Sequence, residues 1–278
     1  MHLMKSVITR DDPPAAGKQE RNRDKPRRGI QSVETGSLLL RVLAGHVAPM
    51  HLRELAGAAG IAAGKAHPYL VSFLKVGFVV QDAAGRYELG PLALQIGLSK
   101  LQRLDPVKAA APLVEQLAEE TGQSIALAVW GTFGPTIVRL DEPVQPMHVN
   151  LRAGSVMALS NTATGRLFAA YMPPKVIAFA REHDLLLQGP HAEPQSRRQF
   201  EALVEETRRH RLSRTIGQPI AGIDAFCAPV FDSTGTLVLG ITAMGPSASF
   251  DSAWDGRVAT ALRRCAEQVS ARLGYVVA

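Results

Sequence analysis

Residues 59–82 read AGIAAGKAHPYLVSFLKVGFVVQD, and this stretch decides how the first part of the chain folds. The small residues at its start indicate a tight turn, the run 62–77 has the spacing of an amphipathic helix, and the β-branched run after it predicts a strand. Pro68 interrupts this pattern because it has no backbone N–H to donate within a helix. We expect either a kink at Pro68 or a helix that begins there, where a proline costs little. The adequate helix formers at 62–66 favour the kink.

Two shorter helical patterns, at 32–46 and 52–60, precede this stretch. Small residues lie where the second and third helices meet, and they allow the close approach and steep angle of a helix-turn-helix. Downstream, a turn at 83–85 and a returning strand at 86–89 predict a hairpin. The sequence therefore predicts a winged helix-turn-helix over residues 29–90. A small helical bundle with an incidental hairpin is the alternative.

The basic charge of the chain is concentrated in its first third. The net charge is +6, and residues 1–90 contain 13 Lys and Arg against 8 Asp and Glu, whereas residues 91–278 contain 18 against 17. Residues 1–28 hold a cluster of Lys and Arg with prolines and no apolar periodicity, so we expect a disordered basic arm. Such an arm suits the phosphates of DNA, and a solvated tail that keeps the protein soluble is the alternative.

The remainder of the chain changes from helices to strands. Residues 91–104 carry more apolar side chains than a small domain can cover, so we expect a linker helix that packs against a partner chain. Residues 105–278 predict an antiparallel sheet with helices packed on it, an α+β domain of the kind that senses ligands. The expected strands are 124–131, 135–142, 147–152, 224–231 and 236–245, and the expected helices are 106–121, 164–172, 174–183, 196–211 and 254–273.

The composition excludes several classes of protein. With 46% hydrophobic and 20% charged residues, the chain has no apolar run near the roughly 20 residues of a membrane span, and its N-terminus lacks the apolar core of a signal peptide. We therefore expect a cytoplasmic protein that does not contact membranes. Two cysteines are too few for a disulfide framework or a zinc cage, and no nucleophile elbow, metal-spaced pair or phosphate loop occurs. We expect no metal, no cofactor and no catalytic residues.

Five segments of the sequence match, in order and spacing, the conserved segments of a known protein family. They are GIQSVETGSLLLRVL, LRELAGAAGIAAGKAH, GRYELGPLALQIG, NTATGRLFAAYMP and, most specific, GIDAFCAPVFDSTGTLVLGITAMGP. Over residues 29–274 the chain resembles the isocitrate-lyase-regulator (IclR) type of bacterial transcription regulators. The resemblance implies a winged helix-turn-helix, a linker helix and a C-terminal effector-binding domain with a GAF-like fold. It also implies homodimers or dimers of dimers on a double-stranded DNA operator, with small organic or aromatic acids as effectors.

Candidate DNA contacts lie on the predicted recognition helix, the wing and the arm. A recognition helix reads base edges in the major groove, while a wing and an arm add contacts to phosphates or the minor groove. The candidates are Lys65, His67 and Tyr69 on the helix, Arg86 on the wing, and Arg27 and Arg28 on the arm. An ordinary exposed side chain is the alternative for each. Where this chain has Gly64-Lys65 and Pro68, the resembled family often has a Ser-Thr pair and an arginine, so operator affinity is expected to depend more on Lys65, the wing and the arm.

The resemblance places the effector site at the start of the helix 164–172 and on the two late strands. A helix N-terminus offers unpaired N–H groups to a carboxylate, and alternate residues of a strand share one face. The candidates are Asn161, Thr162, Ala163, Thr164 and Gly165 at the helix, Gln218 in the preceding loop, and Ala225, Cys227, Thr242 and Met244 on the strands.

The chain departs from the resembled family within this candidate site. Some members carry a cysteine at the position of Ala225, whereas the thiol here is two residues later at Cys227, where a buried structural thiol is the alternative. Members with an acidic residue in the site have it just before the strand pair, where Gln218 offers an amide. Arg139 and Arg152 can pair with an anionic effector, with surface positions as the alternative.

The leading hypothesis is a sequence-specific DNA-binding regulator whose C-terminal domain binds a small metabolite. One alternative is a small-molecule-binding signalling module that uses its helix-turn-helix only to dimerise. The other is a hydrolase that uses Cys227 with a histidine. The residues do not indicate whether the protein represses or activates transcription, which genes it controls or which effector it binds.

Overall fold

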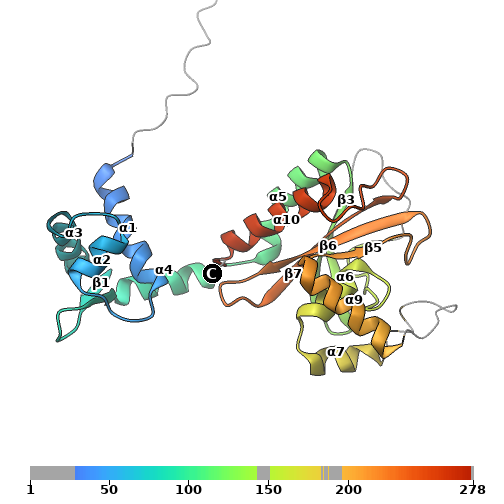
Figure 1. The fold of residues 1–278 in the computed structure, drawn as a ribbon, viewed down its shortest axis with the longest axis horizontal. Helices are drawn as coiled ribbons and strands as arrows, with labels where there is room; N and C mark the ends of the chain where they lie inside the picture. Colours follow the sequence, from blue (N-terminus) through green and yellow to red (C-terminus); the bar gives the residue numbers. More distant parts are fainter. Residues whose placement is uncertain (1–28, 143–150, 183, 185–186, 188–195, 277–278) are drawn as a thin grey trace, which may run out of the picture. The chain divides into compact units, whose positions relative to one another are not determined.

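The computed structural model describes residues 29–142, 151–182, 184, 187 and 196–276. The chain divides into two compact units, Met1–Leu101 and Gln102–Ala278 (Figure 1). Arg27 and Arg28, with the rest of the predicted arm, lie outside the described residues. Among the residues that are described, no helix is long and apolar enough to cross a membrane.

The first unit is a winged helix-turn-helix, as the sequence predicts. Its core is formed by one apolar face from each helix and by the hairpin, with Leu39, Leu55 and Leu70 fully buried. The close approach of the second and third helices is possible because Ala56 and Ala66 are buried at their contact. The elements are α1 (Gln31–Gly45), α2 (Leu52–Ala58), α3 (Ala63–Val76), β1 (Val79–Gln81), β2 (Tyr87–Leu89) and α4 (Pro91–Leu101).

The third helix contains Pro68 in its interior. The backbone N–H groups of Lys65 and Ala66 both donate to the carbonyl of Ala62, so α3 has already begun at Ala63 and the expectation of a start at Pro68 is wrong. Since Pro68 has no N–H, the carbonyl of Gly64 lacks the usual donor four residues later. Burial of Ala66 holds the first turn in helical form despite this missing bond. A kink at Pro68 stays a prediction.

The helix predicted at 91–104 ends earlier, at Leu101. Residues 102–104 form a turn and an extended step before Asp105, whose carboxylate accepts hydrogen bonds from the backbone N–H groups of Val107 and Lys108 at 3.0 and 3.1 Å. This cap, with Pro106 in the first helical position, starts a new helix where the sequence predicts one. No residue of α4 is buried within its own unit.

The second unit is built on one antiparallel sheet with the strand order β4-β3-β7-β6-β5. Strand β6 pairs with β7 over their whole length, with Cys227 opposite Thr242 and Ala225 opposite Met244. The strands are β3 (Ser124–Gly131), β4 (Gly134–Asp141), β5 (Ser213–Thr215), β6 (Ile223–Phe231) and β7 (Leu237–Pro246). The helices are α5 (Pro106–Thr121), α6 (Ala163–Tyr171), α7 (Pro174–Arg181), α9 (Arg197–His210) and α10 (Arg257–Arg272).

Helices cover both faces of this sheet. One face packs against α5 and α10 through the larger side chains of the strands, such as Phe226 and Ile241 (Figure 1). Small side chains face α6 on the other side, where Ala126, Ala128 and Cys227 are fully buried. Because successive residues of a strand point to opposite faces, the sequence alternation separates a large-residue face from a small-residue face.

The second unit differs from the sequence-based expectation at three places. Strand β5 was not predicted, because three residues cannot display an alternating pattern. The last helix begins at Arg257 rather than Trp254, since the Asp251 carboxylate accepts the N–H of Arg257 at 2.7 Å and marks the first turn there. The strand expected at 147–152 lies outside the described residues up to position 150, and positions 151 and 152 are not in a strand.

Replacing Pro68 with alanine supplies the N–H that the Gly64 carbonyl lacks. We expect Pro68→Ala to raise the free energy of unfolding of the full chain by about 1–3 kcal/mol, because the gain of an interior helical bond exceeds the entropy returned to the unfolded chain. Urea denaturation followed by circular dichroism measures this. The control is Pro106→Ala, at the first position of α5, with an expected change under about 0.5 kcal/mol. A lower stability for Pro68→Ala would contradict this account.

Candidate DNA-binding and effector sites

The N-terminal half of α3 presents two of the predicted DNA contacts to solvent. Lys65 and His67 are exposed, whereas Ala66 between them is buried in the core. Tyr69 is half-buried and packs toward α1, where a Cβ on Gly36 would lie 2.9 Å from the Phe73 ring and 3.3 Å from the Tyr69 ring. The structure thus leaves Lys65 and His67 free to contact DNA and gives Tyr69 a role in packing as well.

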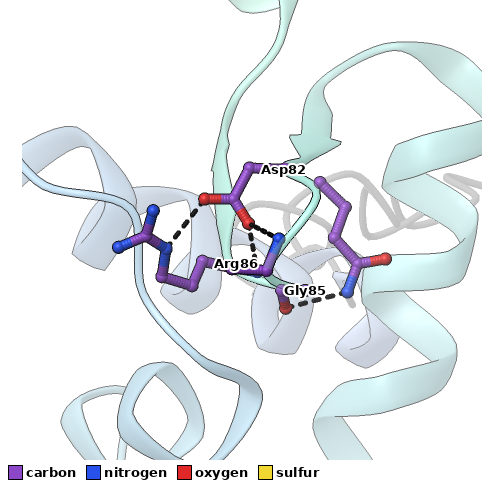
Figure 2. A network of polar contacts seen from close by, with 5 residues as sticks. Asp82, Gly85 and Arg86 are labelled. Atoms are coloured by element: carbon purple, nitrogen blue, oxygen red, sulfur yellow. Dashed lines mark hydrogen bonds and ion pairs between the residues drawn. The ribbon is translucent and has the colours of Figure 1, made fainter.

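The wing holds its predicted contact residue in an ion pair. Asp82 accepts the backbone N–H groups of Ala84 and Arg86 at 2.9 Å, and its second oxygen accepts Nε of Arg86 at 2.7 Å. Figure 2 shows the carboxylate between the Arg86 backbone and its guanidinium, with Gly85 at the turn. The hydrogen bond from the Arg86 backbone, with the adjacent guanidinium charge, lowers the pKa of Asp82. Arg86 is therefore exposed but fixed in direction, with part of its charge balanced.

The start of α6 lies over one row of the sheet, which we call the inner row: Ser213, Cys227 and Thr242. Two contacts fix this position. The Ser213 hydroxyl donates to the carbonyl of Ala163 at 2.5 Å, and the hydroxyls of Thr164 and Thr242 share a hydrogen bond at 2.8 Å. Further along α6, Phe168 and Leu167 fill the space over Gly240, where a Cβ would lie within 3.2 Å of both.

The N-terminus of α6 therefore points at the next row, which we call the outer row: Thr215, Ala225 and Met244. Along β7, Gly240 lies two residues before Thr242 and Met244 lies two residues after it. Because later residues of α6 pack over Gly240 and Thr164 bonds Thr242, the start of the helix is directed toward Met244. Thr215 and Met244 are buried, and Ala225 is half-buried. The structure thus brings the predicted helix start and the predicted strand residues together at one place.

The backbone at the start of α6 is held close to the preceding segment. A Cβ on Gly165 would overlap the carbonyl oxygen of Ala158, so only glycine fits. The Thr162 hydroxyl accepts the N–H of Gly165 at 2.8 Å and donates to the carbonyl of Ala158 at 2.6 Å. This cap leaves the N–H groups of Ala163 and Thr164 without an acceptor among the described residues, which is the arrangement that binds anions at helix starts.

Arg166 is a buried cation at this site that the sequence analysis missed. Its Nε donates to the carbonyl of Ser160 and its Nη1 to the carbonyl of Arg214, both at 2.8 Å. The third contact, from Nη2 to the side-chain oxygen of Gln218, is long at 3.5 Å. Burial lowers the pKa of Arg166, and within the described part of the chain no carboxylate forms an ion pair with it. An arginine within an otherwise apolar helix gave no sequence signal that it would turn inward.

Three buried side-chain oxygens have no hydrogen-bond partner among the described residues: Oε1 of Gln123, Oδ1 of Asn161 and Oγ1 of Thr215. Asn161 and Thr215 directly follow Ser160 and Arg214, whose carbonyls accept from Arg166. Thr215, only 2% exposed, was not among the predicted residues. Most buried polar atoms in proteins are paired, so two orphaned oxygens at one place require an explanation.

Two buried carboxylates hold the segments around the site. Asp224 accepts the N–H of Gly217 at 2.9 Å and the hydroxyls of Ser247 and Ser252, which anchors the loop that carries Gln218. Burial works to raise the pKa of Asp224, but these hydrogen bonds outweigh it and the pKa is lowered. Asp184 accepts from Leu159 and Ser160 and so fixes the segment before α6. Neither residue was singled out from the sequence.

The two arginines considered as partners of an anionic effector are placed elsewhere. Arg139 donates to Asp141 and Glu115 at 2.6–2.7 Å, and these bonds raise its pKa above the ordinary value. Arg152 is exposed. Their positions at the surface agree with the alternative.

A groove of about 230 Å³ lies on the opposite face, between α5 and α10. Its rim carries the Glu120–Arg264 ion pair, and its floor is formed by Leu113 and Cys265. None of the residues lining it has an orphaned buried polar atom. We therefore assign the candidate effector site to the outer row, where unpaired donors and acceptors converge. In the described ranges, no cluster of His, Cys, Asp and Glu is arranged to hold a metal ion.

The fold and the site define the class of winged-helix transcriptional regulators with a second, sensor-like unit. The chain belongs to the IclR family: the model for "Bacterial transcriptional regulator IclR C-terminal" matches residues 98–271, and that for the "IclR helix-turn-helix domain" matches residues 32–83. The chain is 31% identical over 255 residues to the glycerol operon regulatory protein of Streptomyces coelicolor, covering 89% of this chain and 98% of that protein.

Similar proteins extend over nearly the whole chain. The HTH-type transcriptional regulator KipR of Bacillus subtilis is 25% identical over 242 residues, covering 86% of this chain and 96% of that protein. The crystal structure of Pseudomonas aeruginosa HmgR matches with a TM-score of 0.81 and 33% identity, covering 90% of this chain and all of that chain. The glycerol operon regulatory protein and KipR carry the names of regulators, and the expected membership of the IclR family and the expected fold class are confirmed.

Both cysteines are expected to be inert in the folded protein. Burial raises the pKa of Cys227 to about 12, with smaller opposing effects from Thr242 and Thr164, and raises that of Cys265 to about 11. At pH 8 both thiols are protonated, since a thiol ionises only above its pKa, and reaction requires the thiolate. We expect iodoacetamide to label neither cysteine at pH 8 and both in urea, as read by mass spectrometry. Rapid labelling of folded Cys227 would contradict this assignment.

Proposed function

We propose that the protein is a sequence-specific DNA-binding transcriptional regulator whose second unit binds a small organic or aromatic acid, and that the acid modulates operator binding. The observation that carries the DNA-binding half is the exposure of Lys65 and His67 at the start of α3. In a helix-turn-helix, the first residues of the second helix of the motif are the ones that reach base edges in the major groove.

In the proposed DNA surface, the residues of α3 contact bases and the residues of the arm contact phosphates. Lys65 and His67 supply donors at the groove, where Gly64 and the half-buried Tyr69 leave room for close approach. Arg86 extends from the wing, and its bond to Asp82 orients it while reducing its charge. Arg27 and Arg28 are proposed to follow the phosphate backbone, which supports affinity but carries no sequence information. A role on operator DNA would place the protein in the cytoplasm.

The proposed effector site is the space between the N-terminus of α6 and the outer row. The unpaired N–H groups of Ala163 and Thr164 and the positive end of the helix dipole favour a carboxylate there. Arg166 adds a buried positive charge that no described carboxylate balances at close range. Met244 and Ala225 provide an apolar wall for a carbon skeleton.

The protein is also proposed to form dimers through α4. Four large apolar residues of this helix are about half exposed or more, at 65% for Leu94, 49% for Ile96, 49% for Leu98 and 52% for Leu101. Leu94, Leu98 and Leu101 recur at spacings of four and three, so they form one stripe on the helix. Such a stripe marks a surface that a second copy of the chain covers.

The alternative functions have less support. A hydrolase needs an ionised or base-activated thiol, whereas Cys227 is fully buried and burial raises the pKa of its thiol. A signalling module that uses its helix-turn-helix only to dimerise has no need for an exposed lysine and histidine on α3 or for basic residues at the wing. The position of Lys65 and His67 therefore favours DNA binding.

Replacing Lys65 and His67 together tests the DNA-binding proposal. We expect Lys65→Ala/His67→Ala to weaken binding to the protein's own upstream DNA by about 10- to 100-fold, and to reduce the slope of log K against log salt by about 1, because a phosphate or base contact is lost. Mobility shift at several salt concentrations measures both quantities.

The matched control for that experiment is Lys75→Ala. Lys75 is an exposed cation on the same helix, but it lies in the last turn, away from the proposed groove contacts. We expect its loss to change binding by less than about threefold. Equal effects of both variants, or no sequence-preferring binding by the unaltered protein, would contradict the proposal.

Charges placed on the stripe of α4 test the dimer. We expect Leu94→Glu/Leu98→Glu to turn a dimer into a monomer in size-exclusion chromatography with light scattering, because two carboxylates would be desolvated in an apolar contact. Ile96→Glu is the control, since Ile96 lies on the opposite side of the helix and its substitution leaves the stripe intact. A double variant that remains dimeric would show that another surface holds the copies together.

A further inference from the structure

The wing, residues 78–90, carries more negative than positive charge. It contains one cation, Arg86, against the carboxylates of Asp82 and Glu88, so its net charge is −1. Binding to DNA without regard to sequence is supplied mainly by basic side chains that neutralise phosphates. A wing with an excess of negative charge adds little to that kind of binding, and a simple phosphate contact therefore does not account for Arg86.

The bond to Asp82 uses only part of the Arg86 side chain. The carboxylate accepts Nε at 2.7 Å, and no described residue accepts a hydrogen bond from either terminal nitrogen (Figure 2). The Arg86 side chain is 45% exposed, compared with 24% for that of Asp82, so solvent reaches its terminal N–H groups. Asp82 therefore balances much of the charge of Arg86 and leaves a planar pair of donors open.

The backbone that carries this donor pair is fixed on both sides. The Asp82 carboxylate accepts the N–H groups of Ala84 and Arg86 at 2.9 Å, and the carbonyl of Arg86 accepts the N–H of Asp82 at 2.9 Å. Tyr87, the next residue, is buried and exchanges two backbone hydrogen bonds with Met50, at 2.8 and 3.0 Å. The direction of the donor pair is thus set before DNA binds, so little side-chain entropy is lost on contact.

A fixed donor pair with a balanced charge suits base edges better than phosphates. A phosphate accepts from a cation over a wide range of directions, and the negative charge of Asp82 repels it at short range. A base edge instead offers two neighbouring acceptors in one direction, such as N7 and O6 of guanine, and the parallel N–H groups of an arginine match them. The wing therefore has the chemistry of a contact that depends on sequence.

We propose that Arg86 reads a base edge of the operator and that Asp82 is a positioning residue that makes this contact specific. Asp82 holds the terminal nitrogens of Arg86 in one direction, and its charge weakens the attraction of Arg86 to the phosphates of any sequence. The inference rests on the operator binding proposed above. It gives Arg86 a different role from the phosphate contacts of the arm.

Arg86→Lys tests whether the contact needs the donor pair or only a positive charge. Lysine keeps the charge and the backbone N–H that Asp82 accepts, but it cannot present two parallel donors. Mobility shift of the full chain on its own upstream DNA and on a scrambled duplex of the same composition gives the specificity ratio. We expect Arg86→Lys to lower this ratio about fivefold or more, and to change binding to the scrambled duplex by less than about twofold.

Asp82→Asn tests the positioning role. The amide oxygen keeps the two backbone hydrogen bonds of the turn, whereas the amide nitrogen cannot accept Nε of Arg86. We expect binding to the scrambled duplex to strengthen about threefold or more and the slope of log K against log salt to steepen by about 1, because Arg86 becomes a free cation. The specificity ratio should fall about threefold or more, while the melting temperature stays within about 2 °C because the turn is retained.

The matched control is Glu88→Gln. Glu88 is an exposed carboxylate on β2 of the same hairpin, and it forms no ion pair with a described residue. Its replacement changes the net charge by the same amount as Asp82→Asn and leaves the bond between Asp82 and Arg86 intact. We expect binding to both duplexes to rise by less than about threefold, and the specificity ratio to stay the same.

The outcomes separate this inference from the proposed function on which it rests. Sequence-preferring binding with a ratio that Arg86→Lys or Asp82→Asn leaves unchanged would overturn the inference while operator binding stands. An equal fall of the ratio in Glu88→Gln would show that net charge alone acts, and the role of Asp82 would be refuted. If the unaltered protein shows no preference for its upstream DNA, the proposed function and the inference fail together.

Discussion

The packing of α6 against the sheet is the contact on which the second unit depends. Gly240 leaves a gap in β7 that Phe168 and Leu167 fill, and the paired hydroxyls of Thr164 and Thr242 fix the helix along the strand direction. At its start the helix comes so close to the preceding segment that only Gly165 fits. These contacts aim the positive end of the helix at one row of the sheet, and that direction, rather than any single side chain, is what makes this place the candidate site for an anion.

The polar groups around that site are arranged in a way that stability alone does not favour. A guanidinium that has only backbone carbonyls and a long contact to Gln218 as partners is costly to bury, and so are unpaired oxygens on Asn161 and Thr215. Nearby carboxylates, such as Asp224, are instead fully bonded within the protein. Of the three buried oxygens without a partner among the described residues, two therefore follow residues that Arg166 binds, and proteins commonly tolerate such local violations where a ligand binds.

In the first unit, local sequence and tertiary packing agree closely. The helix-turn-helix follows from the positions of apolar and small residues, because each of its contacts lies within a few tens of residues along the chain. Pro68 shows where packing outweighs local preference: a buried Ala66 keeps α3 helical from Ala63, although the proline removes one hydrogen bond. At the wing, the sequence shows a basic residue, but only the structure shows that Asp82 holds Arg86 in a fixed direction.

The sequence by itself determined the order of most helices and strands, the winged helix-turn-helix, the family and the segments proposed to form the effector site, because periodicity, turns and motif spacing are local properties. Only the tertiary structure decided that Arg166 turns inward, that the three-residue strand β5 adds Thr215 to the site, and that Asp184 and Asp224 hold the surrounding segments. Those facts depend on which distant segments meet and on which side chains they leave unpaired. Local pattern cannot contain that information, since the same arginine or threonine on another surface would be an ordinary solvated residue.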